Sequence, residues 1–236
     1  MKPCYVISDL HLFARRSEAS ACQEEIDSAI KDANVLVLGG DTFDFRWSAM
    51  SSPRSTAAAA SRWLRRLRSL NPDCQIHYVL GSHDHHPALI HELEKLKDED
   101  VSFFLYPYHL RLGNALFVHG DVANSRMTEA RLHASRERFA KHAPPAAWMH
   151  FAYDFSVATR LHVLVAKLWY PDAIVLNRIM RYVRALDAGS SEGGRNVYFG
   201  HTHRALVNRL WEGRRFHNGG APIPGLPFQI LKADLS

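Results

Sequence analysis

Short apolar runs recur along the chain, and each is followed within a few residues by aspartate, histidine or glycine. Continuous runs of this length, rich in valine, isoleucine, leucine and aromatic residues, are typical of strands that are buried on both faces. We therefore expect short strands whose exit loops carry polar side chains. The runs occupy residues 4–7, 35–38, 76–80, 115–118 and 197–199.

The stretches between these runs are helical in pattern, as at residues 18–31 and 56–70. An alternation of strands and helices predicts a layered α/β core whose ligands gather beyond the strand ends. The pattern changes toward the C-terminus, where we expect antiparallel strands that close the domain. Glycine and proline separate these last segments, which are residues 206–210, 215–217 and 228–232.

The exit loops hold carboxylates and imidazoles, which are oxygen and nitrogen ligands for metals. A set without thiolate suits Mn²⁺, Fe or Zn²⁺, and two such cations close together can activate a water and neutralise a phosphate. Any one pair of these residues occurs by chance in ordinary proteins, but their joint order at predicted strand ends indicates a metal-dependent phosphoesterase. The candidates are Asp9, His11, Asp41, Ser82, His83, Asp84, His119, His201 and His203.

The order Asp-x-His, Gly-Asp, Gly-x-His-Asp, His and Gly-His-x-His resembles that of the calcineurin-like metallophosphoesterases. The resemblance implies an α/β protein with a layered metallophosphoesterase fold, which is a β-sandwich flanked by helices, and with a helical insertion as a lid. It also implies two divalent metal ions. One ion would be held by Asp9, His11 and His203, and the other by His119 and His201, with Asp41 bridging the two.

The same resemblance places His83 beside the leaving group, as a general acid or charge stabiliser oriented by Asp84. The chain departs from the family pattern at Ser82, where an asparagine amide usually reaches the second metal. A serine hydroxyl is shorter and is a weaker ligand, so we expect that metal to bind less tightly. The alternative is that Ser82 only bonds to the backbone of its turn.

The segment 123–187 carries the net positive charge of the chain. It contains ten lysines and arginines against five aspartates and glutamates, a net of +5 that equals the formal charge of all 236 residues. A charged helical stretch, a proline pair and an aromatic stretch follow one another, and a last helix carries Arg178, Arg181 and Arg184. We predict an inserted helical lid on a core of residues 1–122 and 188–236. The alternative is that these helices only cover the core and their arginines are solvated.

The lid and the residues around the ligands resemble UDP-2,3-diacylglucosamine hydrolase, an enzyme family of lipid A synthesis. The matching features are residues 39–44, His119-Gly120-Asp121 and the helical insertion. The resemblance implies that the pyrophosphate of UDP-2,3-diacylglucosamine is cleaved to UMP and 2,3-diacylglucosamine 1-phosphate, with Mn²⁺ as the usual metal. The side chains expected to line an acyl cleft are Trp148, Phe151, Phe155, Leu164 and Trp169.

Two alternative functions remain open. One is a metallophosphoesterase that acts on a soluble nucleotide or another phosphodiester, and it would be indifferent to acyl chains. The other is a non-catalytic scaffold of the same fold. The complete set of candidate ligands argues against the scaffold, because drift would rarely spare them all.

Composition bears mainly on location. Three cysteines without paired spacing favour a reducing compartment, and no stretch is apolar enough over a sufficient length to span a bilayer. We expect a cytoplasmic enzyme, with peripheral contact to the anionic cytoplasmic face of the inner membrane through the basic, aromatic lid. No nucleic-acid partner is expected, because the basic charge is mixed with large apolar residues in one insertion.

Overall fold

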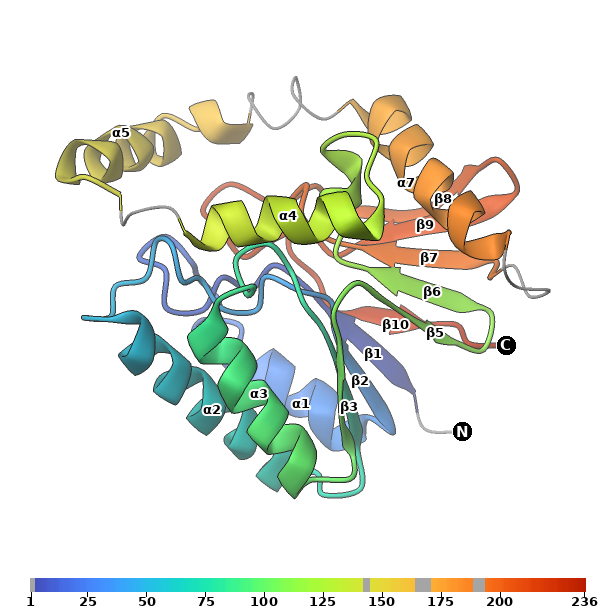
Figure 1. Cartoon of the computed structure of the whole chain (residues 1–236), viewed down its shortest axis with the longest axis horizontal. Coiled ribbons are helices and arrows are strands. Elements are labelled where there is room, and N and C mark those ends of the chain that lie inside the picture. Colours follow the sequence, from blue (N-terminus) through green and yellow to red (C-terminus); the bar gives the residue numbers. More distant parts are fainter. Residues whose placement is uncertain (1–2, 142–144, 164–170, 189–193) are drawn as a thin grey trace.

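Two five-stranded β-sheets lie face to face at the centre of the molecule, with helices on both outer faces (Figure 1). The computed structural model describes residues 3–141, 145–163, 171–188 and 194–236. Between the sheets, Val6, Val37 and Val79 of the first meet Phe117 and Tyr198 of the second. The α/β sandwich flanked by helices is the fold class expected from the sequence.

The first sheet has the strand order β10-β1-β2-β3-β4. Strands β1 to β4 are parallel, and β10 pairs antiparallel with β1 at the edge. Their carboxyl ends therefore meet at one edge of the sheet, where three of the predicted exit loops begin. The strands are β1 (Cys4–Ile7), β2 (Val35–Leu38), β3 (Gln75–Val79), β4 (Phe103–Tyr106) and β10 (Leu231–Ala233).

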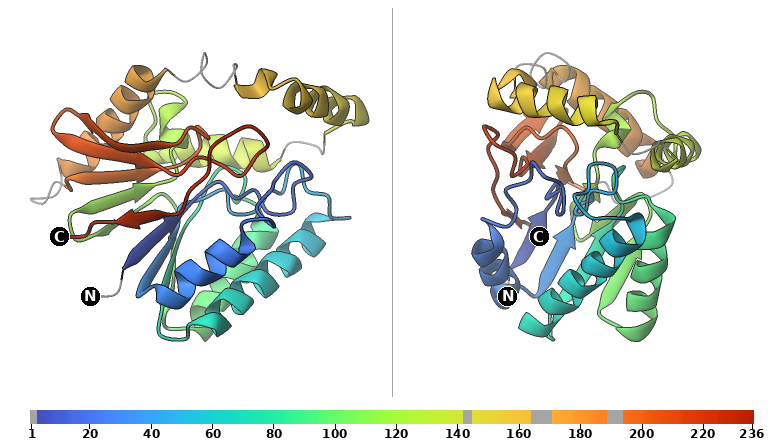
Figure 2. Two further views of the ribbon diagram at one scale, coloured as in Figure 1. Left: turned by 180° about the vertical axis from the view of Figure 1, so that it is seen from behind. Right: turned by 90° about the vertical axis from the view of Figure 1, so that its left-hand side faces the viewer.

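Three helices cover the outer face of this sheet (Figures 1 and 2). They are α1 (Gln23–Asp32), α2 (Pro53–Leu70) and α3 (Pro87–Glu99). Helix α2 begins at a capping box in which Ser52 and Ser55 satisfy each other's backbone N–H groups, with proline in the first turn, as helix starts favour. Its apolar face packs into the largest hydrophobic cluster, between the helices and the sheet.

The second sheet has the order β5-β6-β7-β9-β8, and its three central strands run parallel. Helix α7 (Asp172–Asp187) and the short 3₁₀ helix η1 (Asp121–Ala123) cover its outer face through a second apolar cluster. The strands are β5 (His109–Leu112), β6 (Ala115–Val118), β7 (Asn196–Phe199), β8 (Leu206–Trp211) and β9 (Arg214–Asn218).

The C-terminal strands differ in part from the expectation. Strands β8 and β9 do form an antiparallel pair, but β9 also pairs parallel with β7. The last strand begins at Leu231 rather than at residue 228, because Phe228 makes only an isolated bridge with Gly220. This strand closes the first sheet and not the second.

Helices α4 (Glu129–Ala140) and α5 (Ala147–Ala158) also lie between β6 and α7 in the chain, within the predicted insertion. Of these two, α5 lies farther from the sheets (Figure 1). Helix α7, by contrast, buries Leu176, Ile179 and Val183 against the second sheet. Among the described helices, none has the length and apolar character needed to cross a bilayer. The division into a core and a 123–187 lid stays a prediction. Within this segment, α4 and α5 have fewer buried side chains than α7.

Candidate metal centre

All the metal-ligand candidates lie on loops just after the carboxyl ends of β1, β2, β3, β6 and β7. The structure brings six of them into two adjoining groups whose ligand atoms lie within 4.8 Å of one another. The seventh, Ser82, contacts the second group through its hydroxyl. The groups are Asp9, His11 and His203, and Asp41, His119 and His201.

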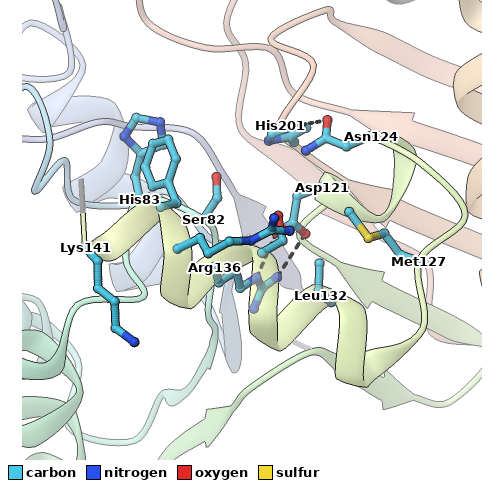
Figure 3. Close-up of a pocket in the computed structure, with 12 residues that line it drawn as sticks. Ser82, His83, Asp121, Asn124, Met127, Leu132, Arg136, Lys141 and His201 are labelled. Atoms are coloured by element: carbon cyan, nitrogen blue, oxygen red, sulfur yellow. Dashed lines mark hydrogen bonds and ion pairs between the residues drawn. The ribbon is translucent and has the colours of Figure 1, made fainter.

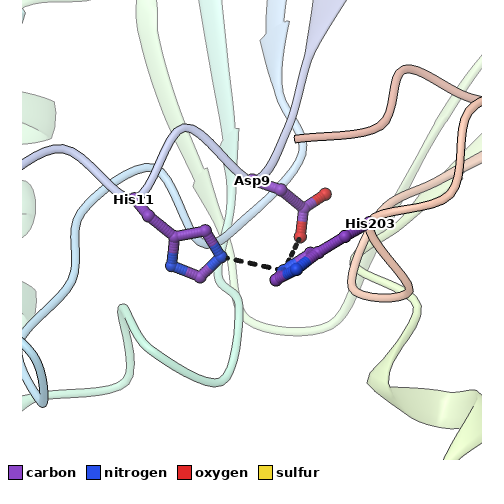
Figure 4. Close-up of side chains that lie close together, drawn as sticks. All are labelled: Asp9, His11 and His203. Atoms are coloured by element: carbon purple, nitrogen blue, oxygen red, sulfur yellow. Dashed lines mark hydrogen bonds and ion pairs between the residues drawn. The ribbon is translucent and has the colours of Figure 1, made fainter. Parts of the chain in front are cut away.

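The first group converges on a small space between three side chains (Figure 4). His11 Nε2 lies 3.0 Å from His203 Nε2, and His203 Nε2 lies 3.7 Å from Asp9 Oδ1. Donor atoms bound at about 2.0–2.2 Å around one first-row cation are about 3–3.5 Å apart. The arrangement of this group therefore fits a divalent cation.

The second group is centred on Asp41. His119 Nε2 lies 3.1 Å from Asp41 Oδ2, and Ser82 Oγ donates a hydrogen bond to the same oxygen at 3.3 Å. The other oxygen, Oδ1, accepts the backbone N–H of His83 at 2.7 Å. Asp41 also lies within 4.8 Å of ligand atoms of His11 and His83. Its carboxylate is therefore located between the two groups.

Two of the converging atoms are left unsatisfied in a way that fits a bound cation. Asp9 Oδ2 is buried and has no hydrogen-bond partner among the described residues, and His119 Nε2 is buried with only its ion-pair contact to Asp41 Oδ2. Buried polar atoms of folded proteins nearly always have a partner. The carboxylates of Asp9 and Asp41 are also both buried in this centre. A bound cation would give the unpartnered Asp9 oxygen a ligand contact and would offset the repulsion between the two carboxylates.

The backbone at the site adopts an uncommon conformation. Asp9, His11, Asp41, His201 and His203 all have positive φ, between 45° and 67°. Such a conformation costs a non-glycine residue about 1–3 kcal/mol and tends to persist at functional sites. All five residues are candidate ligands, so the uncommon conformation coincides with the proposed metal centre.

Two glycines allow the close approach of loops around the carboxylates. A Cβ at Gly81 would collide with the Asp41 carboxylate, and one at Gly200 would collide with that of Asp9. Asp9 Oδ1 also accepts the backbone N–H of His201 at 2.7 Å. The glycines of the Gly81-Ser82 and Gly200-His201 patches therefore have a steric reason in this site.

The protonation states of two of the ligand histidines favour cation binding, whereas burial lowers and the Asp41 carboxylate raises the pKa of a third, His119, which reaches about 10. Burial and neighbouring histidines lower the pKa of His201 to about 4 and that of His203 well below its ordinary value. Both imidazoles are neutral at pH 7 and can offer a lone pair. Burial, joined by the charge of Asp41, raises the pKa of Asp9 to about 6. A cation would oppose that rise, since it favours the ionised carboxylate.

Residues 2–205 match the model of the calcineurin-like phosphoesterase family. The chain belongs to this family. No curated protein matches the sequence. Membership implies a metal-dependent hydrolase of phosphoesters, and the two groups described above are sites at which this phosphoesterase could hold divalent metals.

Contrary to the expectation, Asp84 of this phosphoesterase makes no hydrogen bond with His83 among the described residues. The Asp84 carboxylate accepts the backbone N–H groups of Thr42 and Phe43, at 3.3 and 2.9 Å. The carboxylate beside His83 is that of Asp44, whose Oδ1 lies 3.0 Å from His83 Nδ1. Asp84 therefore fixes the loop that carries Asp41, while Asp44 faces the histidine.

Asp44 also contacts His11, whose Nδ1 lies 3.2 Å from Asp44 Oδ2. Burial opposes ionisation of Asp44, but the neighbouring His83 and His11 hold its pKa well below the ordinary value. Burial lowers and the carboxylates of Asp44 and Asp41 raise the pKa of His83, which reaches about 9. In the sequence, Asp44 could have been singled out only by its position three residues after Asp41, in the same exit loop.

The structure adds contacts from the predicted insertion that the sequence did not indicate. Asn124 Oδ1 lies 2.8 Å from His201 Nε2. Arg136 of α4 is 1% exposed and binds both oxygens of Asp121, at 2.7 and 2.9 Å (Figure 3). Asp121 directly follows the His119-Gly120 patch, so this ion pair attaches α4 to the loop of the metal centre.

A cavity of about 530 Å³ extends from the metal centre along α4 (Figure 3). At one side it reaches Ser82, His83 and His201, which belong to the centre or border it. The rest of its lining includes the apolar Met127, Leu132 and Phe139 and the basic Arg138 and Lys141, beside the polar Asn124 and Ser135 and the paired Asp121 and Arg136. A substrate bound at the centre therefore has room to extend beneath α4.

The aromatic residues expected to line an acyl cleft are placed differently. Trp148, Phe151 and Phe155 lie on α5 and are 70%, 75% and 59% exposed. The cavity of about 530 Å³ along α4 is not lined by these three residues. Leu164 and Trp169 lie outside the described residues.

Proposed function

We propose that this phosphoesterase hydrolyses the pyrophosphate of UDP-2,3-diacylglucosamine to UMP and 2,3-diacylglucosamine 1-phosphate, a step of lipid A synthesis. The observation that supports it best is the cavity beneath α4. It begins at His83 and His201 and combines apolar with basic side chains, as a substrate with both acyl chains and phosphates requires. The alternative substrates, soluble nucleotides and other phosphodiesters, have no acyl chains to place against the apolar part.

In this proposal the candidate ligands hold two divalent metal ions, which we infer to be Mn²⁺. Asp9, His11 and His203 hold one, and His119 and His201 hold the other, with Asp41 shared and Ser82 as a weak additional ligand. When bound, such ions supply Lewis acidity and activate a water for attack on phosphorus. The mixed oxygen and nitrogen donor set, free of thiolate, suits Mn²⁺ as well as Fe and Zn²⁺, and Mn²⁺ is the metal that the resemblance implies.

The protein groups around the ions have separate parts in the proposal. His83 protonates or stabilises the leaving oxygen. Its pKa of about 9 keeps the imidazole protonated at pH 7, so it has a proton to transfer as a general acid does. Asp44 holds the imidazole by its Nδ1 side. Asp84 contributes indirectly, through the backbone of Thr42 and Phe43.

We also propose a peripheral contact of the lid with an anionic membrane on the cytoplasmic side. The exposed aromatic face of α5 supports it, since tryptophan and phenylalanine insert at the boundary of headgroups and acyl chains. Of the predicted basic residues on α7, Arg178 donates to the backbone of Ala123 and Asn124, and Arg184 pairs with Glu212. Arg181 is exposed, and we assign it to the membrane-facing set.

One experiment separates the proposal from its alternative. Purified protein is analysed for bound metals and assayed with Mn²⁺ on UDP-2,3-diacylglucosamine, on soluble nucleotides and on bis(p-nitrophenyl) phosphate. The proposal expects kcat/KM to be highest on the acylated substrate. Preference for a soluble nucleotide or phosphodiester would establish the alternative, and bound metal without turnover of any phosphoester would favour a scaffold.

A further inference from the structure

Arg16 is a buried arginine next to the metal centre that is not among the candidate ligands. Its side chain is only 6% exposed. Nε donates to Asp154 Oδ1 and Nη2 donates to the backbone carbonyl of His150, both at 2.7 Å. The remaining nitrogen, Nη1, is buried and has no hydrogen-bond partner among the described residues. A buried charged donor without a partner is unfavourable, so this nitrogen is suited to an anionic ligand.

The cavity beside Arg16 joins it to the metal centre. The cavity measures about 110 Å³, and its lining includes His11, His203 and His83 together with Arg16. It is therefore large enough for a compact group of several heavy atoms. A substrate whose reacting phosphorus lies among the ligands can place a neighbouring group in this space.

One carboxylate, that of Asp44, lines the same cavity, and its charge is already balanced. Asp44 Oδ1 accepts the backbone N–H groups of Arg46 and Trp47, at 2.9 and 2.7 Å. The same oxygen lies 3.0 Å from His83 Nδ1, and Oδ2 lies 3.2 Å from His11 Nδ1. Asp44 is thus satisfied without Arg16 and does not take the place of a ligand there.

The guanidinium of Arg16 is held in a fixed position by aromatic rings as well as by hydrogen bonds. Its carbon lies 4.4 Å from the ring centre of Tyr153 on α5 and 5.4 Å from that of Trp47. A planar guanidinium stacked in this way loses little freedom when it binds an oxyanion. The site is therefore built in advance for an anion.

We propose that Arg16 binds the second, non-scissile phosphoryl group of a diphosphate substrate, by a hydrogen bond from Nη1 to one of its oxygens. The proposal rests on the proposed function for the site at which the scissile group is bound, and it adds a residue that selects for a diphosphate. A simple phosphoester lacks the second group and leaves Nη1 unsatisfied. Arg16 is thus a specificity-determining residue that also connects α5 to the substrate.

The test compares inorganic phosphate with methylenediphosphonate, a non-hydrolysable diphosphate, by isothermal titration calorimetry at fixed free Mn²⁺. One charge-assisted hydrogen bond corresponds to about a tenfold difference in Kd. The wild type should bind the diphosphonate about tenfold more tightly than phosphate. Arg16→Met should reduce that ratio to about threefold or less. Arg15→Met is the matched control, because Arg15 is the adjacent, exposed arginine, and it should keep the full ratio.

Arg16→Lys is measured beside Arg16→Met, because it keeps the charge near α5 if the methionine variant does not fold. A lysine ammonium cannot serve Asp154, His150 and a ligand with the geometry of a guanidinium, so its ratio should fall as well. An unchanged ratio in a folded Arg16 variant, or a wild type with no preference for the diphosphonate, would overturn the proposal. A wild type that prefers the diphosphonate but does not hydrolyse the acylated UDP-sugar would refute only the proposed function.

Discussion

Among single residues of the metal centre, the imidazoles of His201 and His203 are neutral, whereas that of His83 is charged. His201 and His203 are buried with a lowered pKa, and they can donate lone pairs to cations. His83 faces the buried carboxylates of Asp44 and Asp41, and its pKa is raised to about 9 although burial opposes the charge. The carboxylates of Asp44 and Asp41 therefore account for the charge of His83, while burial and neighbouring histidines keep His201 and His203 neutral.

Replacement of His83 tests its role at the leaving group. His83→Ala should lower kcat by about 10²–10⁴-fold, the range of general acid catalysis, and should leave the metal content of the purified protein unchanged. Steady-state kinetics and elemental analysis measure the two quantities. His91→Ala is the control, because His91 is exposed on α3. Loss of metal from the His83 variant would show that the residue belongs to the ligand set instead.

Ser82 allows a test of the ligand that the family usually supplies by asparagine. Its hydroxyl lies 3.3 Å from Asp41 Oδ2, so a longer amide at this position can reach into the second group. Ser82→Asn should lower the Mn²⁺ concentration that gives half-maximal activity. Ser69→Asn, at an exposed serine of α2, should have no effect. An unchanged Mn²⁺ requirement in the Ser82 variant would identify Ser82 as a turn residue only.

At the scale of elements, α5 presents three large aromatic side chains to solvent. Phe155→Ser should impair turnover of acylated UDP-sugar in the presence of anionic vesicles and spare bis(p-nitrophenyl) phosphate, because only the first substrate has acyl chains to bury, at about 0.8 kcal/mol per methylene. The kcat/KM values for both substrates measure the effect. Val101→Ser is the matched control, at an apolar side chain that is 93% exposed outside α5.

The two possible failures of this prediction have different meanings. Equal losses on both substrates would show that Phe155→Ser destabilises the protein in general. An unaffected acylated substrate would contradict a contact of α5 with lipid, and the preference for a lipid pyrophosphate would then depend on the cavity along α4 alone.

Strand β3 contains a buried histidine that should affect stability in acid. Burial lowers the pKa of His77 to about 4, below its ordinary value of 6.5. As the pH falls, His77 is therefore protonated near pH 6.5 in the unfolded chain but only near pH 4 in the folded chain. His77 contributes its full stability above pH 6.5 and loses it as the pH falls, by about 1.4 kcal/mol per pH unit over this interval at most.

His77→Phe removes this proton uptake and keeps a ring that can stack on Phe104, whose ring centre lies 4.7 Å from that of His77. Urea unfolding between pH 7 and pH 4.5 should show a shallower loss of unfolding free energy in the variant than in the wild type. His91→Phe, at an exposed site, should keep the wild-type slope. Identical slopes for His77→Phe and the wild type would contradict the assignment.

The sequence predicted the central strands well and the edges poorly. Residues 4–7, 35–38 and 115–118 are the full lengths of β1, β2 and β6, because strands buried on both faces are continuous apolar runs. Strands β4 and β5 were not predicted. Tyr106 and Arg111 illustrate why, since both are only partly buried and their segments lack a clear boundary between strand and loop.

The candidate site was predictable where ligands follow directly after strands. Asp44 and the Asp121–Arg136 pair were missed, since their role depends on which loops face each other in space. Asp84 was paired with His83 because the two are neighbours in sequence, but successive side chains of a loop can point in different directions. The contact of Asp44 with His83 joins segments 39 residues apart, and only the fold determines such a contact.

At the scale of the whole molecule, Arg136 joins parts that are distant in the chain. From α4 its guanidinium binds Asp121, at the loop after β6, and donates to the carbonyl of Pro107 at 2.6 Å. Pro107 lies in the connection between β4 of the first sheet and β5 of the second. One buried side chain therefore fixes the predicted lid to the metal-centre loop and to the passage between the sheets.

Arg136→Met should lower the free energy of unfolding by about 3–5 kcal/mol, because it leaves the Asp121 carboxylate buried without its partner. Urea denaturation measures this loss. In the Arg136→Met variant, backbone amides should exchange faster across α4 than across α2, since α4 has few other buried side chains. Arg131→Met, at an exposed position of the same helix, should change neither the unfolding free energy nor the exchange rates. The double variant Asp121→Asn with Arg136→Met should recover part of the stability, because no unpaired charge remains. If the double variant were less stable than Arg136→Met alone, the ion pair would not be the main link between α4 and the core.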